Sequence, residues 1–212
     1  MMFADRLALT PVIPALVIEQ ADHALALARA LSRGGLTVIE IQLTTPAALA
    51  AIARIAAELP EMVVGAGGVL TPKDLRRAAR AGAQFAVSPG FLPKLAEDPE
   101  IPLLPGVATA SELMRALDRG YDTLGLFPAE LLGGVAALRV FARAFPQVRF
   151  VPGGDIPPAR APAYLAEPNV LALSVSWVAP ISAVREANWD HITFLAREAA
   201  SRRAPPVPDP AP

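Results

Sequence analysis

Eight apolar stretches of strand length, separated by alanine-rich segments, constrain the fold of this chain more than any other feature. Segments between them, such as 21–35, 45–60 and 109–121, repeat apolar residues every three or four positions, which is typical of amphipathic helices. Continuous apolar strands alternating with such helices indicate a parallel sheet covered by helices. The predicted strands lie within 11–18, 36–43, 61–67, 83–90, 101–106, 121–128, 148–154 and 170–177.

This alternation predicts an α/β fold, and two architectures are compatible with it. Eight repeats of about 25 residues suffice to close a small (β/α)8 TIM barrel. An open, doubly wound sheet is the alternative. We favour the barrel, as a single domain over residues 1–203, because 212 residues are enough for one large core and too few for two. The proline-rich segment 204–212 has little to bury and is predicted to be a disordered tail.

Helix start signals accompany three of the predicted helices. Thr45-Pro46 and Thr71-Pro72 combine a capping residue with a proline suited to the first turn. Thr109 precedes Glu112 by three positions, which is the spacing of a capping box.

Composition narrows the class of partner. The formal net charge is −1 with scattered basic residues, so no nucleic-acid interface is expected and a small molecule is the predicted ligand. The chain has no cysteine, which excludes disulfides and thiolate chemistry. It begins without a basic and apolar leader and lacks an apolar run of ~20 residues, so we expect a cytoplasmic protein without membrane association.

In a barrel of this kind, functional side chains gather at the carboxyl ends of the strands. Alternation along the second predicted strand puts Glu40, Gln42 and Thr44 on one face. A glutamate within an otherwise apolar strand indicates a carboxylate that points into the barrel.

The ordered motifs of the chain resemble those of the 2-keto-3-deoxy-6-phosphogluconate (KDPG) and 4-hydroxy-2-oxoglutarate (KHG) aldolase family. The likeness runs over nearly the whole length, through "PVIPALVIEQADHALALARAL", "GGLTVIEI", "AGAQFAVSPG", "IPLLPGVATASELMRALDRGY", "FPAE", "VRFVPGG" and "PNVLALSVSWVAP". The resemblance implies a class I aldolase on a (β/α)8 barrel, a homotrimer, and pyruvate held as a Schiff base on a lysine of the sixth strand.

Matching the motifs position by position puts Gly125 where the resemblance implies that lysine. Glycine cannot form an imine, and the only lysines, Lys73 and Lys94, fall in segments predicted as loop or helix. Schiff-base chemistry is therefore not expected. Gln42 and Thr44 stand at family positions occupied by threonine and by an arginine that holds the substrate carboxylate.

The phosphate-binding motifs of the family also differ here. Gly68 replaces a threonine, Gly153, Gly154 and Asp155 replace Thr-Gly-Gly, and Ser174, Val175 and Ser176 replace Gly-Gly-Ser. Because phosphate sites use bare backbone N–H groups, Val175 should block the ligand and Asp155 should repel it. With Phe91, Leu92, Leu131 and Leu132 in the loops, these changes predict a wider and more apolar pocket.

Such departures gather at the barrel mouth, which suggests a repurposed pocket that arose by deliberate redesign or, alternatively, by natural divergence. The leading hypothesis is an enzyme that binds an apolar or aromatic molecule and abstracts a proton with a carboxylate, without metal or cofactor. One alternative is a carbon–carbon lyase (aldolase) acting on 2-keto-3-deoxy sugar acids without the usual lysine, for which a bound divalent metal that polarises the keto acid is one route. Another is a non-catalytic binding or assembly scaffold.

Two carboxylates are the candidate catalytic bases. Asp155 would be strengthened by desolvation at the rim of an apolar pocket, although it could instead cap a helix beginning at Pro157 or Pro158. Glu40 would act as an acid and base, or be a buried carboxylate satisfied by Gln42. The predicted substrate-binding residues are Gln42, Thr44, Gly68, Gly125, Phe127, Gly153, Gly154, Ser174, Val175 and Ser176.

Overall fold

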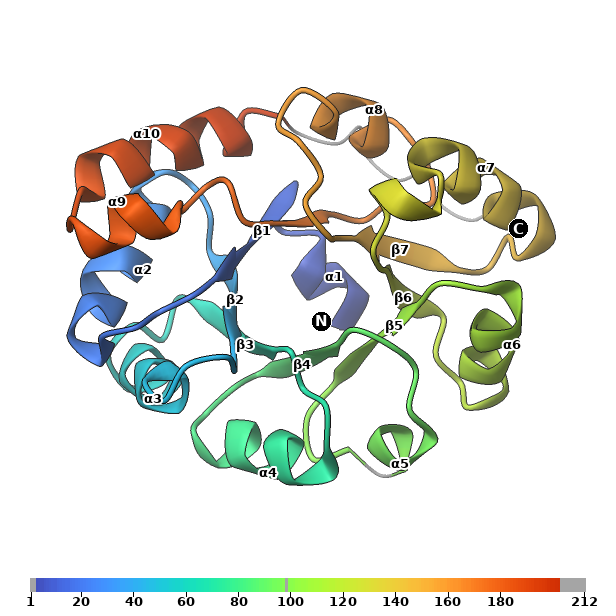
Figure 1. Cartoon of the computed structure of the whole chain (residues 1–212), viewed down its shortest axis with the longest axis horizontal. Helices are drawn as coiled ribbons and strands as arrows, with labels where there is room; N and C mark the ends of the chain where they lie inside the picture. Colours follow the sequence, from blue (N-terminus) through green and yellow to red (C-terminus); the bar gives the residue numbers. More distant parts are fainter. Residues whose placement is uncertain (1–2, 98, 203–212) are drawn as a thin grey trace.

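A computed structural model describes residues 3–97 and 99–202 of the chain. Its eight strands are parallel and form one sheet in the order β7-β6-β5-β4-β3-β2-β1-β8 (Figure 1). All eight predicted strands are present, because each apolar run is buried on both faces of the sheet. Their bounds are β1 Val12–Leu16, β2 Val38–Gln42, β3 Val63–Gly67, β4 Phe85–Ser88, β5 Leu103–Val107, β6 Thr123–Leu126, β7 Arg149–Pro152 and β8 Leu173–Val175.

The sheet curls into a barrel. β1 pairs with β8 through Val12 opposite Leu173, which joins the first strand to the last. Between β7 and the segment ahead of β8, Phe150 forms a parallel bridge with Val170, and the N–H of Leu171 donates to the carbonyl of Phe150 at 2.9 Å. These pairings confirm the (β/α)8 barrel over the open sheet.

Helices surround the barrel on its outer side, and α1 alone lies across its centre in the view of Figure 1. Amphipathic segments pack their apolar face on the strands and expose the opposite face, as in α2, where Leu27, Ala28 and Leu31 are buried. The helices are α1 Phe3–Leu7, η1 Ala21–His23, α2 Ala24–Arg33, α3 Ala48–Glu58, α4 Pro72–Arg80, α5 Pro93–Ala96, α6 Ala110–Asp118, η2 Glu130–Leu132, α7 Gly134–Ala144, α8 Ala161–Leu165, α9 Ile181–Arg185 and α10 Trp189–Ala200.

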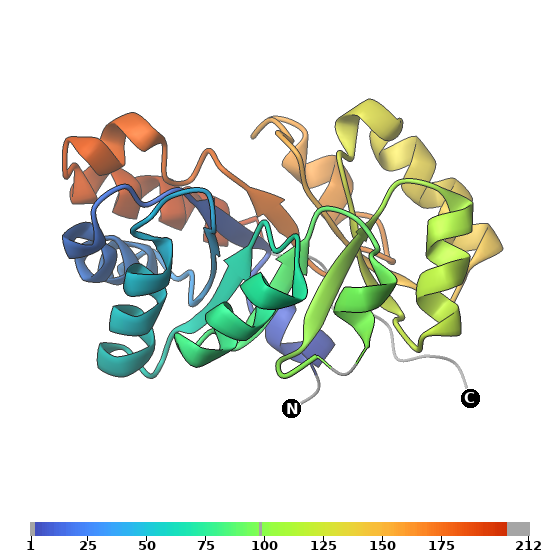
Figure 2. The ribbon, with the colours of Figure 1, turned by 60° about the horizontal axis from the view of Figure 1, so that its bottom comes forward.

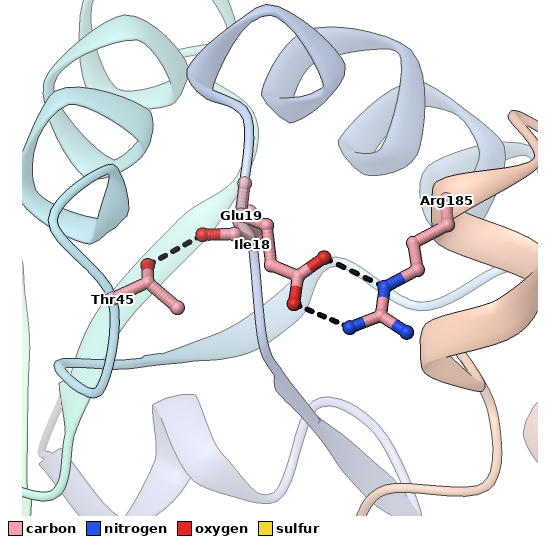
Figure 3. Close-up of polar contacts among 4 residues, drawn as sticks. All are labelled: Ile18, Glu19, Thr45 and Arg185. Carbon is pink, nitrogen blue, oxygen red and sulfur yellow. Dashed lines mark hydrogen bonds and ion pairs between the residues drawn. The ribbon is translucent and has the colours of Figure 1, made fainter.

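Two of the three predicted helix starts are confirmed. Thr71 and Thr109 each accept a hydrogen bond from the backbone three residues later, in complete capping boxes with Asp74 and Glu112. The prediction at Thr45 is wrong, because α3 begins at Ala48 and Thr45 is not its cap. Its hydroxyl donates instead to the carbonyl of Ile18 at 2.5 Å, which ties the loop after β2 to the loop after β1 (Figure 3).

The amino end of the barrel is filled by a separate apolar cluster. Leu7 of α1 is fully buried there against Ile13, Phe85 and Val151, residues of three different strands. Figure 2 shows α1 at this end of the barrel. Because α1 covers the amino end, the interior of the barrel opens at the carboxyl ends of the strands.

Some predictions concern residues that are not described. Segment 204–212 and residue 203 lie outside the described residues, so the proposed tail and the end of the domain stay predictions. Within the described ranges, no helix has the length and apolar character needed to cross a bilayer.

Candidate functional site

A cavity of about 270 Å³ opens at the carboxyl ends of the strands. This is the position at which (β/α)8 enzymes place their active sites, and the volume suits a small molecule. Eighteen residues line it: Ala15, Val17, Glu40, Gln42, Gly68, Val87, Ser88, Pro89, Leu104, Gly106, Gly125, Phe127, Val151, Gly153, Gly154, Asp155, Ser174 and Ser176.

Glu40 is the most buried charged group of this cavity. Its residue exposure is only 4%, and its carboxylate accepts hydrogen bonds from Gln42 Nε2 at 2.6 Å and from Ser174 Oγ at 3.2 Å. Burial raises the pKa of Glu40, and the hydrogen bonds from Gln42 and Ser174 oppose that rise. A raised pKa makes the ionised carboxylate a stronger base, which suits Glu40 to proton transfer.

A glycine on the neighbouring strand leaves room for this pair of side chains. Glu40 and Gln42 lie opposite Gly65 and Gly67 in the register of β2 and β3. A Cβ atom at Gly67 would lie 2.1 Å from Glu40 Oε1 and 2.3 Å from Gln42 Nε2. The glycine therefore permits the conformation in which Glu40 and Gln42 meet over β3.

Gly125 forms part of the opposite wall. It lies on β6 between Gly106 of β5 and Val151 of β7. A Cβ atom there would be 3.5 Å from its nearest neighbour, the Cα of Gly106, which is ordinary van der Waals contact. A side chain at 125 would thus fit and occupy the cavity. Lys73 on α4 and Lys94 on α5 are exposed and do not line it.

The loops after β6 and β7 are joined by backbone hydrogen bonds. The N–H of Gly153 donates to Leu126 at 3.0 Å, and the N–H of Ala129 donates back to Gly153 at 2.8 Å. Gly154 has φ of +92°, and a Cβ there would lie 2.9 Å from the Cα of Pro128. Only glycine allows this close approach, which brings both loops to the cavity wall.

A buried tyrosine braces the same two loops from outside. The Tyr164 hydroxyl on α8 donates to Glu130 Oε1 at 2.6 Å, and Arg160 Nε lies 3.6 Å from that oxygen. Burial, followed by the hydrogen bond to Glu130, raises the pKa of Tyr164. Because Glu130 follows β6 and Tyr164 lies on α8, this contact ties the segment after β6 to the helix that follows β7.

Asp155 lines the cavity at its rim but is exposed to solvent, with φ of 53°. The desolvation from which its strength as a base was predicted is therefore absent, because solvent reaches the side chain. The alternative in which it caps a helix is wrong as well. α8 begins at Ala161, after Arg160, and has no side-chain cap.

Ten of the twelve predicted site residues line the cavity, and Thr44 and Val175 do not. Thr44 lies in an exposed turn beyond the end of β2. Val175 is buried in the apolar core, because strand alternation sends Ser174 and Ser176 into the cavity and Val175 to the helix side. Its side chain therefore does not block the cavity, which corrects the prediction.

Eight lining residues were not among the predicted site residues, which came chiefly from the loops and strand ends that depart from the family motifs. Most of them are apolar residues inside the strands, and period-two alternation along strands 1, 4, 5 and 7 was the signal that could have identified them. They are Ala15, Val17, Val87, Ser88, Pro89, Leu104, Gly106 and Val151. In the described part of the chain, no three histidine, aspartate or glutamate side chains gather as a metal site would require.

Comparison with known proteins places this geometry in a family. The family model of KDPG and KHG aldolases matches residues 3–195. The KHG/KDPG aldolase of Escherichia coli K12 is 48% identical over 192 residues, which cover 89% of this chain and 90% of that protein. The 2-dehydro-3-deoxy-phosphogluconate aldolase of Zymomonas mobilis is also 48% identical, over 91% of this chain and 92% of that protein.

Solved structures agree with the sequence relatives. The KDPG aldolase of Legionella pneumophila, with pyruvate captured at low pH as a covalent carbinolamine intermediate, superimposes with a TM-score of 0.92 at 40% identity, covering 94% of this chain and 98% of that one. The Zymomonas mobilis ZM4 enzyme with 3-phosphoglycerate gives 0.89 at 44% identity, covering 97% and 98%. The chain with this cavity at the carboxyl ends of its strands belongs to the KDPG and KHG aldolase family.

Proposed function

We propose that this protein is a carbon–carbon lyase of the aldolase type, which cleaves a 2-keto-3-deoxy acid to pyruvate and an aldehyde without a protein amine. The observation that carries the proposal is Glu40, a buried carboxyl group that faces the cavity of an aldolase-family barrel. Family membership supports this reaction over proton abstraction from an apolar molecule, because the curated relatives at 40–48% identity are aldolases.

Glu40 would carry the proton through the cleavage. As a carboxylate it takes the proton of the substrate's C4 hydroxyl, the aldehyde carbonyl forms, and the electron pair of the C3–C4 bond passes to the pyruvate fragment as an enolate. Glu40 then returns the same proton to C3, which completes pyruvate. Gln42 and Ser174 hold the carboxyl group in place during both transfers.

No lysine amine is among the described residues that line the cavity, so the proposed cleavage proceeds without a Schiff base. Lys73 and Lys94 lie outside the cavity, and Gly125 contributes space in place of a side chain. A neutral donor, the Ser176 hydroxyl at the cavity wall, is left to stabilise the enolate oxygen. We therefore expect slow turnover compared with an enzyme that forms a Schiff base.

Deuterium exchange into the methyl group of pyruvate tests the proton transfer directly. In D2O the protein should catalyse exchange that is visible by proton NMR, and Glu40→Gln should reduce its rate about 100-fold or more. Glu58→Gln, the same substitution at an exposed site, is the control. Exchange at the protein-free rate, or exchange unaffected by Glu40→Gln, would contradict the proposal. Pyruvate release from KDPG and from KHG, followed with lactate dehydrogenase, then identifies the substrate.

Gly125 favours a second candidate, a binding protein that has lost catalysis. Its cavity wall carries no amine, so the site could hold a 2-oxo acid without turning it over. Saturable pyruvate binding in calorimetry without exchange or cleavage would establish this alternative. We also propose a homotrimer, on the strength of the family resemblance, and sedimentation equilibrium would test it.

A further inference from the structure

Among the residues that the structure describes, those lining the cavity include acidic side chains and no basic ones. Among its eighteen lining residues, Glu40 and Asp155 carry carboxyl groups, and none is lysine, arginine or histidine. Every other polar lining side chain is a neutral serine or amide. The charge complement of the cavity is therefore a positively charged ligand.

Glu167, a second buried glutamate outside the cavity, differs from Glu40 in having a cationic partner. Glu40 and Glu167 have similar exposures, 4% and 8%. Glu167 forms an ion pair with Arg139 at 2.7 Å. For Glu40, the described residues offer only two neutral hydrogen-bond donors, Gln42 and Ser174. A buried carboxylate without a cation is costly, so Glu40 is the group that a cationic ligand would satisfy.

We propose that the cavity binds a small primary alkylammonium ion, with its nitrogen at the Glu40 carboxylate and its carbon chain against the apolar wall. That wall includes Val17, Leu104 and Val151. A volume of about 270 Å³ admits a chain of a few carbons. Oxygen atoms of Ser174 and Ser176 are available as further acceptors for the three ammonium hydrogens.

The proton balance of this binding gives it a signature. An ammonium ion that enters beside a protonated Glu40 displaces that proton to solvent, so affinity should rise with pH, by up to tenfold per unit, until Glu40 is ionised in the free protein. The strands beside Glu40 present Ala15 and Gly65 in register, and Ser174 faces it from β8. Asp155 is the other titrating group of the cavity.

An ammonium ion also bears on the aldolase reaction, and this part of the inference rests on the proposed function. A 2-oxo acid brings a carboxylate into a cavity that has no cationic side chain. An ammonium ion bound beside it would neutralise that charge. The two ligands should therefore bind cooperatively, each increasing the affinity for the other by the same factor.

Calorimetric titration with n-propylammonium chloride tests the site, with 1-propanol as the neutral probe and propionate as the anionic one. We expect propylammonium to bind more tightly than 1-propanol, with affinity rising as the pH increases above the ordinary carboxyl pKa of 4.5, because the pKa of Glu40 is raised. Glu40→Gln should weaken it about tenfold or more and abolish the pH dependence, whereas Glu58→Gln should change neither. Equal affinity for propylammonium and 1-propanol, or unchanged binding in a folded Glu40→Gln variant, would overturn the proposal.

Asp155→Asn separates the two carboxylates. If Glu40 is the partner, this variant keeps most of the affinity and all of the pH dependence. If Asp155→Asn, and not Glu40→Gln, weakened propylammonium binding and abolished its pH dependence, the assignment to Glu40 would be overturned.

Titrating pyruvate with and without propylammonium separates this inference from the aldolase proposal. Pyruvate binding and exchange without any propylammonium binding would overturn the ammonium site and leave the lyase standing. Propylammonium binding in a protein that neither binds nor exchanges pyruvate would uphold the site and remove the lyase. Binding of both with higher affinity together would support the cooperative role.

Discussion

Gln42 Nε2 donates a hydrogen bond of 2.6 Å to Oε1 of Glu40, two residues earlier on the same strand. Side chains at this spacing share one face of β2, so both enter the cavity together. The amide orients the carboxyl group and partly offsets the effect of burial on its pKa.

Replacing Glu40 with glutamine should stabilise the protein at neutral pH and change little at low pH. Burial holds the pKa of Glu40 in the folded chain above the ordinary value of 4.5. The favourable contribution of Glu40 to the free energy of unfolding is fully present below the pKa that Glu40 has in the unfolded chain. This contribution is lost as the pH rises through the higher pKa of Glu40 in the folded chain. Urea unfolding from ~pH 4 to ~pH 8 should show the stability difference between Glu40→Gln and wild type growing with pH. A difference that stays constant with pH would contradict this.

Two glycine-to-alanine variants should behave in opposite ways. Gly67→Ala places a methyl group 2.1 Å from Glu40 Oε1 and should cost about 1–3 kcal/mol through overpacking, or displace Glu40 and weaken pyruvate binding. At Gly125 the new methyl group has 3.5 Å of clearance, so Gly125→Ala should be neutral or stabilising by about 0.5 kcal/mol. Thermal and urea unfolding of the pair measure the contrast, and equal effects would refute the packing argument.

A lysine at position 125 should acquire Schiff-base chemistry. Its side chain has room to enter the cavity, where desolvation favours the neutral, nucleophilic amine. Pyruvate followed by borohydride should add a pyruvyl group to Gly125→Lys, detected by intact-protein mass. Gly125→Met, which is of similar length without an amine, should remain unlabelled, as should the unmodified chain. Labelling of the unmodified chain would mean that Lys73 or Lys94 reaches the keto acid.

Removing the Tyr164 hydroxyl should loosen the two loops behind the cavity. Tyr164→Phe deletes the 2.6 Å hydrogen bond to Glu130 and should cost about 1.5 kcal/mol, because the acceptor is charged. Tyr121→Phe removes the same atom from a half-buried tyrosine elsewhere and serves as the control. Urea unfolding compares the two variants. A smaller loss in Tyr164→Phe than in Tyr121→Phe would count against the brace.

The strands could be predicted from sequence because each lies in a predominantly apolar run. Such a run can be recognised locally, without knowing which segments it contacts in the fold. α1 could not be predicted, since Phe3–Leu7 is too short to show helical periodicity and is held by packing of Leu7 under the barrel. Thr45 carries a valid capping signal, but a tertiary hydrogen bond to Ile18 takes its hydroxyl. A local capping signal such as that of Thr45 therefore fails to predict the helix start when the side chain hydrogen-bonds to a residue distant in the sequence.

Site residues such as Glu40 and Gln42 could be predicted because side chains alternate between the two faces of a strand. Features that depend on the register between neighbouring strands could not be predicted. The need for glycine at 67 arises from contact across β2 and β3, which no single-strand pattern reveals. Val175 was assigned to the pocket from its motif, although its parity with Ser174 and Ser176 sends it the other way. That the departures from the family motifs arose by deliberate redesign, or alternatively by natural divergence, stays a prediction.

On the far side of the cavity mouth, the loop after β1 is also anchored, since Glu19 forms two hydrogen bonds with Arg185 of α9, at 2.6 and 2.7 Å (Figure 3). Beneath it, Val87, Leu104 and Val151 line the cavity and also pack in the cluster that contains Leu7 of α1. The cavity is thus a well with a packed floor. A molecule held in this well therefore enters and leaves through the mouth at the carboxyl ends of the strands.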